Sequence, residues 1–148
     1  MGKSFFYYKN SSLENLSLDN WQSKKSKMEL EELRVYNHAM ELGEEIWKIV
    51  IKWSFFEKDT IGKQLVKSAD SIAANLSEGF GRYHYKETKH FSYYSRGSLY
   101  ETKTWLVKAN NRDLISEEKL TTLISEINQI GKMLNAYIKS IGTSSNNQ

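Results

Sequence analysis

The chain of 148 residues contains no cysteine and no proline. Without cysteine it can form neither disulfide bonds nor thiolate metal sites. Proline interrupts helices, so its absence from a chain with long periodic segments favours an all-helical domain over a sandwich of short strands. The longest apolar runs fall far short of the roughly 20 residues that span a membrane, and the first residues lack a signal-peptide pattern. We therefore expect one soluble, cytoplasmic domain.

Charge is unevenly distributed along the chain, although the formal net charge is only +3. Residues 28–60 contain eight acidic and four basic residues, whereas residues 61–112 contain nine basic and four acidic residues. Residues 1–27 add five lysines against two acids. Such a separation favours a basic surface on the central part of the chain. A solvated helix surface of mixed charge is the plainer interpretation.

Apolar periodicity separates a helical body from two polar ends. Residues 1–27 are rich in serine, asparagine and lysine and have no sustained apolar period, which predicts a flexible basic tail. Residues 143–148 are predicted to be a disordered C-terminal tail. Residues 28–142 are predicted to form the folded domain, because apolar residues recur there at steps of three and four.

Four long helices are predicted within this body. They cover about residues 30–53, 61–79, 86–110 and 117–141. Asp59 or Thr60 is expected to cap the second helix, and Phe55 and Phe56 are expected to lie in a loop that seals one end of the core. Tyr94 is expected among the inward residues of the third helix. Helices of this length with short connections predict an antiparallel up-down four-helix bundle.

One polar constellation stands out on the second and third predicted helices. It consists of Asn75, Glu78, Arg82, Arg96 and Glu101. The first three members follow each other at steps of three and four, so they share a helix face. The set is either a binding or catalytic site, or a network of ion pairs that fixes helix register and subunit packing. The second interpretation is favoured, because paired charges without a cofactor more often specify structure than chemistry.

Two further sets are candidates for binding. The basic residues of the central hairpin are candidates for nucleic-acid contact, namely Lys63, Lys67, Arg82, Lys86, Lys89, Lys103, Lys108 and Arg112. The alternative is a small metal-binding or enzymatic bundle that uses Glu78, His84, Glu87 and His90. A di-iron site in a helical bundle needs two Glu-x-x-His motifs, and this chain has one, from Glu87 to His90. We therefore predict no enzymatic activity, no cofactor and no metal site.

The aromatic residues exceed what a single bundle of this size buries. Those concerned are Trp47, Trp53, Phe55 and Phe56 around the end of the first predicted helix, and Tyr93, Tyr94, Tyr100 and Trp105 on the third. Apolar surface left over in a soluble chain tends to mark an interface. The pattern predicts a homo-oligomer; the alternative is a monomer whose tyrosines lie flat on its surface.

Two sequence motifs carry a family resemblance. The first reads Ser71-Ile-Ala-Ala-Asn-Leu-Ser-Glu-Gly-Phe-Gly-Arg82, and the second consists of Phe91 followed by Arg96-Gly-Ser-Leu-Tyr-Glu101. Together they resemble the signature of bacterial 23S rRNA intervening-sequence proteins, over about residues 33–141. The resemblance implies an up-down four-helix bundle, a ring-like homopentamer and no known enzymatic activity. Related accessory variability proteins of diversity-generating retroelements bind nucleic acid and a reverse transcriptase, so RNA or an RNA-associated protein is the implied partner.

Overall fold

The computed structural model describes residues 18–142, and within this range all regular secondary structure is helical. In chain order the elements are α1 (Leu18–Lys25), the 3-10 turn η1 (Leu30–Glu32), α2 (Arg34–Val50), α3 (Phe55–Glu57), the π-helical turn η2 (Lys58–Gly62), α4 (Lys63–Phe80), α5 (Tyr85–Asn111) and α6 (Glu117–Ser140). The all-α prediction is confirmed for this part of the chain. The predicted C-terminal tail, residues 143–148, and residues 1–17 of the predicted N-terminal tail lie outside it.

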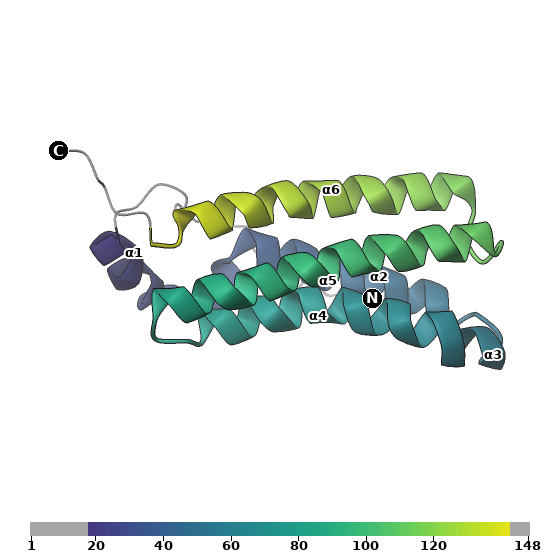
Figure 1. Ribbon diagram of the computed structural model, residues 1–148, viewed down its shortest axis with the longest axis horizontal. Helices are drawn as coiled ribbons and strands as arrows, with labels where there is room; N and C mark the ends of the chain where they lie inside the picture. The colour runs from purple at the N-terminus through teal and green to yellow at the C-terminus, as the bar shows by residue number, and fades with distance from the viewer. Residues whose placement is uncertain (1–17, 143–148) are drawn as a thin grey trace.

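Four long helices, α2, α4, α5 and α6, lie side by side and alternate in direction along the chain (Figure 1). Helix α4 packs against α2 and α5, and α6 packs against the same two helices. Each long helix therefore has two neighbours, and the pair α2 and α4 lies on the opposite side of the molecule from the pair α5 and α6. None of the helices between residues 18 and 142 is long and apolar enough to cross a membrane.

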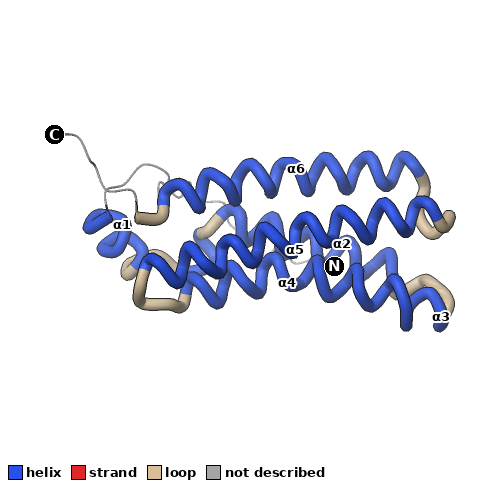
Figure 2. Tube along the Cα trace, in the orientation of Figure 1, coloured by secondary structure: helices blue, strands red, loops and turns tan. Residues whose placement is uncertain are grey.

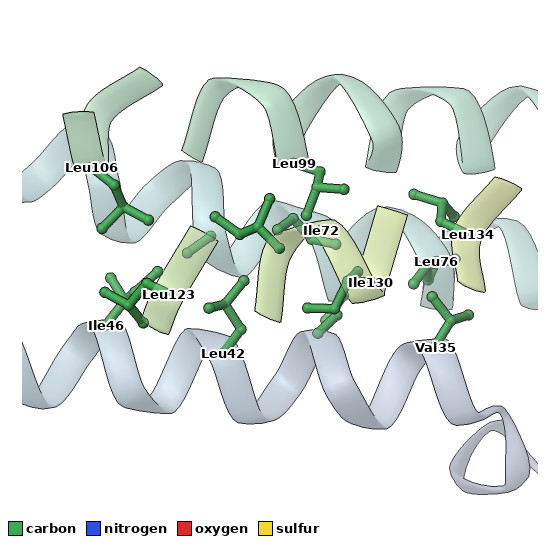
Figure 3. Packing of buried hydrophobic residues seen from close by; sticks show 14 of the residues in the cluster. Val35, Leu42, Ile46, Ile72, Leu76, Leu99, Leu106, Leu123, Ile130 and Leu134 are labelled. Carbon is green, nitrogen blue, oxygen red and sulfur yellow. The ribbon is translucent and has the colours of Figure 1, made fainter. Parts of the chain in front are cut away.

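The core lies along the common axis of the four long helices (Figure 3). Its largest fully buried side chains include Leu42 and Ile46 from α2, Ile72 and Leu76 from α4, Leu106 from α5, and Leu123, Ile130 and Leu134 from α6. They recur at steps of three and four residues, which places them on one face of each helix. The apolar repeats predicted for α4 and α6 agree with this packing. On α2 the repeat was expected to include Trp47, but this side chain is 51% exposed, and Leu42 and Ile46 are buried instead.

The inner face of α5 differs from the prediction. Its buried positions include the small hydroxyl residues Thr88, Ser92, Ser95 and Thr102, whereas Tyr94 is 54% exposed. The expectation that Tyr94 points inward is therefore wrong. The buried hydroxyls are paired: Ser95 Oγ donates to the Ile72 carbonyl at 2.7 Å and Ser92 Oγ donates to the Thr88 carbonyl at 2.8 Å. Small, satisfied side chains allow α5 to approach α4 closely.

The start of the second long helix also differs from the prediction. Ser54 is the N-cap: its hydroxyl accepts from the Glu57 amide at 3.3 Å, and the Glu57 carboxylate accepts from the Ser54 amide at 2.8 Å. This capping box starts a helix that continues through η2 into α4 (Figure 2). The prediction of a cap at Asp59 or Thr60 is wrong, because both lie inside η2. Phe55 and Phe56 do not seal the core; they are 80% and 75% exposed.

Helix α1 lies within a segment for which no helix was predicted, and it is joined to the turn between α4 and α5. Lys25 is buried, and its ammonium donates to the carbonyl of Arg82 at 2.7 Å, to Thr88 Oγ1 at 2.9 Å and to the carbonyl of Gly79 at 3.4 Å. Burial lowers the pKa of Lys25 to about 8, against the opposing attraction of Glu87. Lys25 thus binds carbonyl groups at the C-terminal end of α4 and in the turn that follows it.

Candidate interaction surfaces

The predicted polar constellation is divided in the structure. At the end of α4, Arg82 Nη2 lies 2.5 Å from Glu78 Oε1, and Arg82 Nη1 lies 3.8 Å from Glu87 Oε1. The Arg82 guanidinium also stacks on the Phe91 ring at 5.0 Å. The Glu78 and Arg82 side chains are 51% and 42% exposed, so this ion pair contributes only about 0–1 kcal/mol to the stability of one protomer.

Arg96 and Glu101 have other partners. Arg96 Nη1 donates to Asn135 Oδ1 on α6 at 3.2 Å, and its guanidinium lies over the Tyr93 ring at 4.9 Å. Glu101 accepts from Trp105 Nε1 at 3.2 Å. The predicted pairing of these two residues with Glu78 and Arg82 therefore does not occur within the protomer. A pairing across a subunit boundary stays a prediction.

Asn75, the remaining member of the constellation, links α4 to α5 rather than to the charged residues. Its amide donates to the Ser71 carbonyl at 2.8 Å and to Ser98 Oγ at 3.5 Å. This contact is local to the interface between the two helices. The five residues therefore belong to four separate local arrangements in the protomer.

The four residues of the metal-binding alternative do not converge. The His84 ring packs edge-on against Tyr83, with ring centroids 5.0 Å apart, and the His90 ring packs against Tyr94 at 5.6 Å. Glu78 and Glu87 both face Arg82 instead. Between residues 18 and 142, no group of three or more histidine, aspartate or glutamate side chains is placed to hold a metal ion.

The candidate nucleic-acid residues are spread over the molecule and do not form one patch. Lys63 and Lys67 line a hollow beside Trp47, at the end of α2. Arg82 and Lys86 flank the turn between α4 and α5, and Lys108 and Arg112 lie at the far end of α5. The remaining two, Lys89 and Lys103, belong to a row on α5 that also contains aromatic residues.

This row, here called the α5 row, alternates cationic and apolar side chains. Its members are Lys89, Tyr93, Arg96, Tyr100, Lys103 and Val107. They follow each other at steps of four and three, so they lie on one face of the helix. Tyr93, Tyr100 and Val107 are 42%, 66% and 40% exposed. The hydrogen bond from Arg96 to Asn135 places the row on the edge of α5 that faces α6.

On the opposite side of the molecule, two hollows follow the seam between α2 and the η2–α4 helix, and we refer to them together as the α2–α4 groove. One has a volume of about 350 Å³ and is lined by residues that include Tyr36, Met40, Glu44 and Asp70. The other has a volume of about 520 Å³ and contains apolar side chains, among them Trp47, Ile51, Phe55 and Val66. Sequence analysis predicted the aromatic excess at Trp47 and Phe55 but not the groove.

Two carboxylates occupy the smaller hollow. Asp70 lies against the α2 backbone, since a Cβ atom added to Gly43 would be only 2.8 Å from Asp70 Oδ1. Partial burial, and secondly the nearby charge of Glu44, raise the pKa of Asp70. Within residues 18–142 neither Glu44 nor Asp70 has an ion-pair partner. The smaller hollow thus holds two carboxylates without an ion-pair partner, whereas Lys58, Lys63 and Lys67 line the larger hollow beside its apolar side chains.

Comparison with known proteins identifies the family. The model of the family described as 23S rRNA-intervening sequence protein matches residues 31–136. A crystal structure of a protein with unknown function from the S23 ribosomal protein family of Bacteroides thetaiotaomicron VPI-5482 has the same fold, with a TM-score of 0.64 and 21% sequence identity over 71% of this chain and 98% of that chain. No curated protein matches the chain. The matched span confirms the resemblance found in the sequence motifs, and the chain belongs to the 23S rRNA-intervening sequence protein family.

Proposed function

We propose that this chain is a non-enzymatic scaffold protein of the cytoplasm. Its protomer is an antiparallel up-down four-helix bundle, and its assembled form is a ring-like homopentamer. The observation that carries the proposal is exposed apolar surface on the α2–α4 groove, where Trp47, Ile51 and Phe55 are 51%, 51% and 80% exposed. Contiguous apolar surface on a soluble protein tends to mark an interaction site.

The protomer offers two different surfaces for assembly. The α2–α4 groove and the α5 row belong to different helices on opposite sides of the bundle, and both expose apolar side chains. When one surface of a subunit contacts a different surface of the next subunit, the contact can repeat from subunit to subunit. The chain of subunits closes into a ring if the rotation between neighbours adds up to a full turn. The number five rests on the resemblance to the family.

The double variant Trp47→Ser, Ile51→Ser tests the oligomer. We expect the wild type to elute as an oligomer and the variant to elute with the mass of one chain, because both side chains are half-exposed in the protomer and contribute to the interface. Light scattering coupled to size-exclusion chromatography measures the mass, and circular dichroism checks that the helix content is unchanged. Tyr83→Ser is the matched control: Tyr83 is 81% exposed at the turn between α4 and α5, outside both surfaces. A wild type with the mass of one chain refutes the proposal.

RNA, or an RNA-associated protein, is the partner that we propose for this scaffold. The observation behind this choice is the number of basic residues along the sequence, nine between positions 61 and 112, which lie at separate places on the molecule and include Lys86 and Lys108 on exposed positions of α5. The family description, which refers to 23S rRNA, supports the same choice. Binding to phosphates releases counterions, so RNA affinity is expected to fall steeply with salt.

A gel shift with structured RNA at rising salt concentration tests this partner. The variant Lys86→Ala, Lys108→Ala is expected to bind RNA more weakly. The slope of the logarithm of the binding constant against the logarithm of the salt concentration is expected to become shallower by about one for each lysine that contacts phosphate. Lys132→Ala, an exposed lysine of α6 outside the candidate set, is the matched control. Absence of binding at low salt removes RNA from the proposal and leaves a role in protein–protein contacts.

A further inference from the structure

We propose that the α2–α4 groove of one copy binds the α5 row of a second copy of this chain, with Arg96 inserted between Glu44 and Asp70. This inference rests on the proposed function above, and it names the two surfaces that meet in the oligomer. It is carried by charge, by the spacing of the flanking side chains and by the placement of the two surfaces on opposite sides of the bundle.

The first argument is charge complementarity. Glu44 and Asp70 face the same hollow, and no cation of the described chain pairs with either. Two carboxylates in a partly desolvated groove repel each other, and a guanidinium relieves this repulsion while donating hydrogen bonds to both.

The side chain of Arg96 is suited to binding two neighbouring carboxylates. A guanidinium carries five N–H donors in a planar fork, and the structure assigns one hydrogen bond to it, from Nη1 to Asn135 at 3.2 Å. Its stacking on the Tyr93 ring, 4.9 Å away, orients the group before any partner arrives. Preorganisation of this kind lowers the entropy lost when the contact forms.

The second argument is the spacing of apolar side chains around the charges. On α5, Tyr93 precedes Arg96 by three residues and Tyr100 follows it by four. On α2, Met40 precedes Glu44 by four residues and Trp47 follows it by three. At 1.5 Å per residue these distances are about 4.5 Å and 6 Å on each helix. If the two helices run antiparallel, Tyr93 meets Trp47 and Tyr100 meets Met40 when Arg96 meets Glu44.

The third argument is that one copy can use both surfaces at once. The groove lies between α2 and α4, whereas the row lies on the edge of α5 beside α6. Each copy therefore presents a groove to one neighbour and a row to another. Repetition of this single contact produces a closed ring or an open filament, depending on the rotation between neighbours.

Charge reversal tests the pairing. Glu44→Arg and Arg96→Glu are each expected to raise the concentration at which the oligomer dissociates by about a hundredfold or more, since each places like charges together in a partly desolvated contact. The double variant Glu44→Arg, Arg96→Glu is expected to regain most of the assembly. Glu118→Arg, an exposed residue of α6 outside both surfaces, is the matched control and is expected to assemble like the wild type. Mass photometry over a dilution series measures the masses, and circular dichroism confirms that each variant is folded.

Mixing the two single variants adds a second, independent outcome. Each variant repels itself, but the groove of either accepts the row of the other, so the mixture is expected to form assemblies in which the two chains alternate. Strict alternation needs an even number of subunits, so the mixture is expected to form even-numbered or open assemblies and not the ring of five proposed for the wild type.

The possible results separate this inference from the proposed function. If the wild type is an oligomer and both single variants assemble like it, the pairing is wrong while the oligomer stands. If the single variants dissociate, the double variant does not reassemble and the mixture forms no species that contains both chains, the direct contact between Arg96 and the two carboxylates is overturned. If the wild type itself has the mass of one chain, both the pairing and the proposed function are refuted.

Discussion

The variant Gly79→Ala is expected to lower the free energy of unfolding by about 2–3 kcal/mol, although alanine favours helix more than glycine does. Gly79 is buried on the face of α4 that packs against α5. A Cβ atom there would lie 2.8 Å from the Cβ of Phe91 and 3.1 Å from the carbonyl oxygen of Thr88. Neither atom belongs to the free end of a flexible side chain, so the two helices have to separate.

Gly97→Ala is the matched control for this prediction. Gly97 also lies inside a helix, but nothing is within 4 Å of an added Cβ atom. Alanine is expected to raise stability there by about 0.5–1 kcal/mol through its helix propensity. Chemical denaturation at one fixed protein concentration measures both variants, because assembly shifts apparent stability. Equal stability of the two variants would show that α4 and α5 are not in close contact at Gly79.

The second large effect is expected at Ser95. This side chain is fully buried and donates to the Ile72 carbonyl at 2.7 Å. Ser95→Leu replaces the hydroxyl oxygen with three carbon atoms in a contact that has no room for them and removes the hydrogen bond, so it is expected to cost about 2–4 kcal/mol. Tyr94→Leu, one residue earlier and 54% exposed, is expected to change stability by less than about 0.5 kcal/mol. Thermal denaturation measures both variants. A lower melting temperature for Tyr94→Leu than for Ser95→Leu would support the prediction that Tyr94 points inward.

Sequence reasoning predicted the fold where large apolar residues mark the inner face. Helices α2, α4 and α6 bury leucine and isoleucine at steps of three and four, and this pattern is visible without a structure. It failed on α5, because serine and threonine fill most of the buried positions and look like surface residues. As a result, Tyr94 was assigned to the core of the bundle. Tyr100 was counted only among the aromatic residues in excess.

Local hydrogen bonding explains two further errors. The capping box between Ser54 and Glu57 starts the helix five residues earlier than the expected cap at Asp59, and this turns Phe55 outward. The contacts of Lys25 were not predicted, because Lys25 lies in a polar segment whose composition predicted a flexible tail. Its role depends on carbonyl groups of Gly79 and Arg82 that are more than fifty residues away in the chain, and no periodic pattern reveals such a contact.

The sequence predicted some residues of the candidate surfaces but not the α2–α4 groove. Arg96 was singled out by its motif, and Trp47, Tyr93 and Tyr100 were singled out as aromatic residues in excess. The groove was missed, because Glu44 and Asp70 come from different helices and meet only when α2 packs against α4. A pair of acids on separate helices gives no signal in spacing, whereas the residues of one helix face do.

Native mass spectrometry of the wild-type protein tests the central claim, assembly into a closed ring, most directly. It counts the chains in one particle, and the mass of one chain is 17.3 kDa. The account predicts a single dominant species of five chains that persists on dilution into the low micromolar range. A particle that contains one chain throughout this range would contradict it.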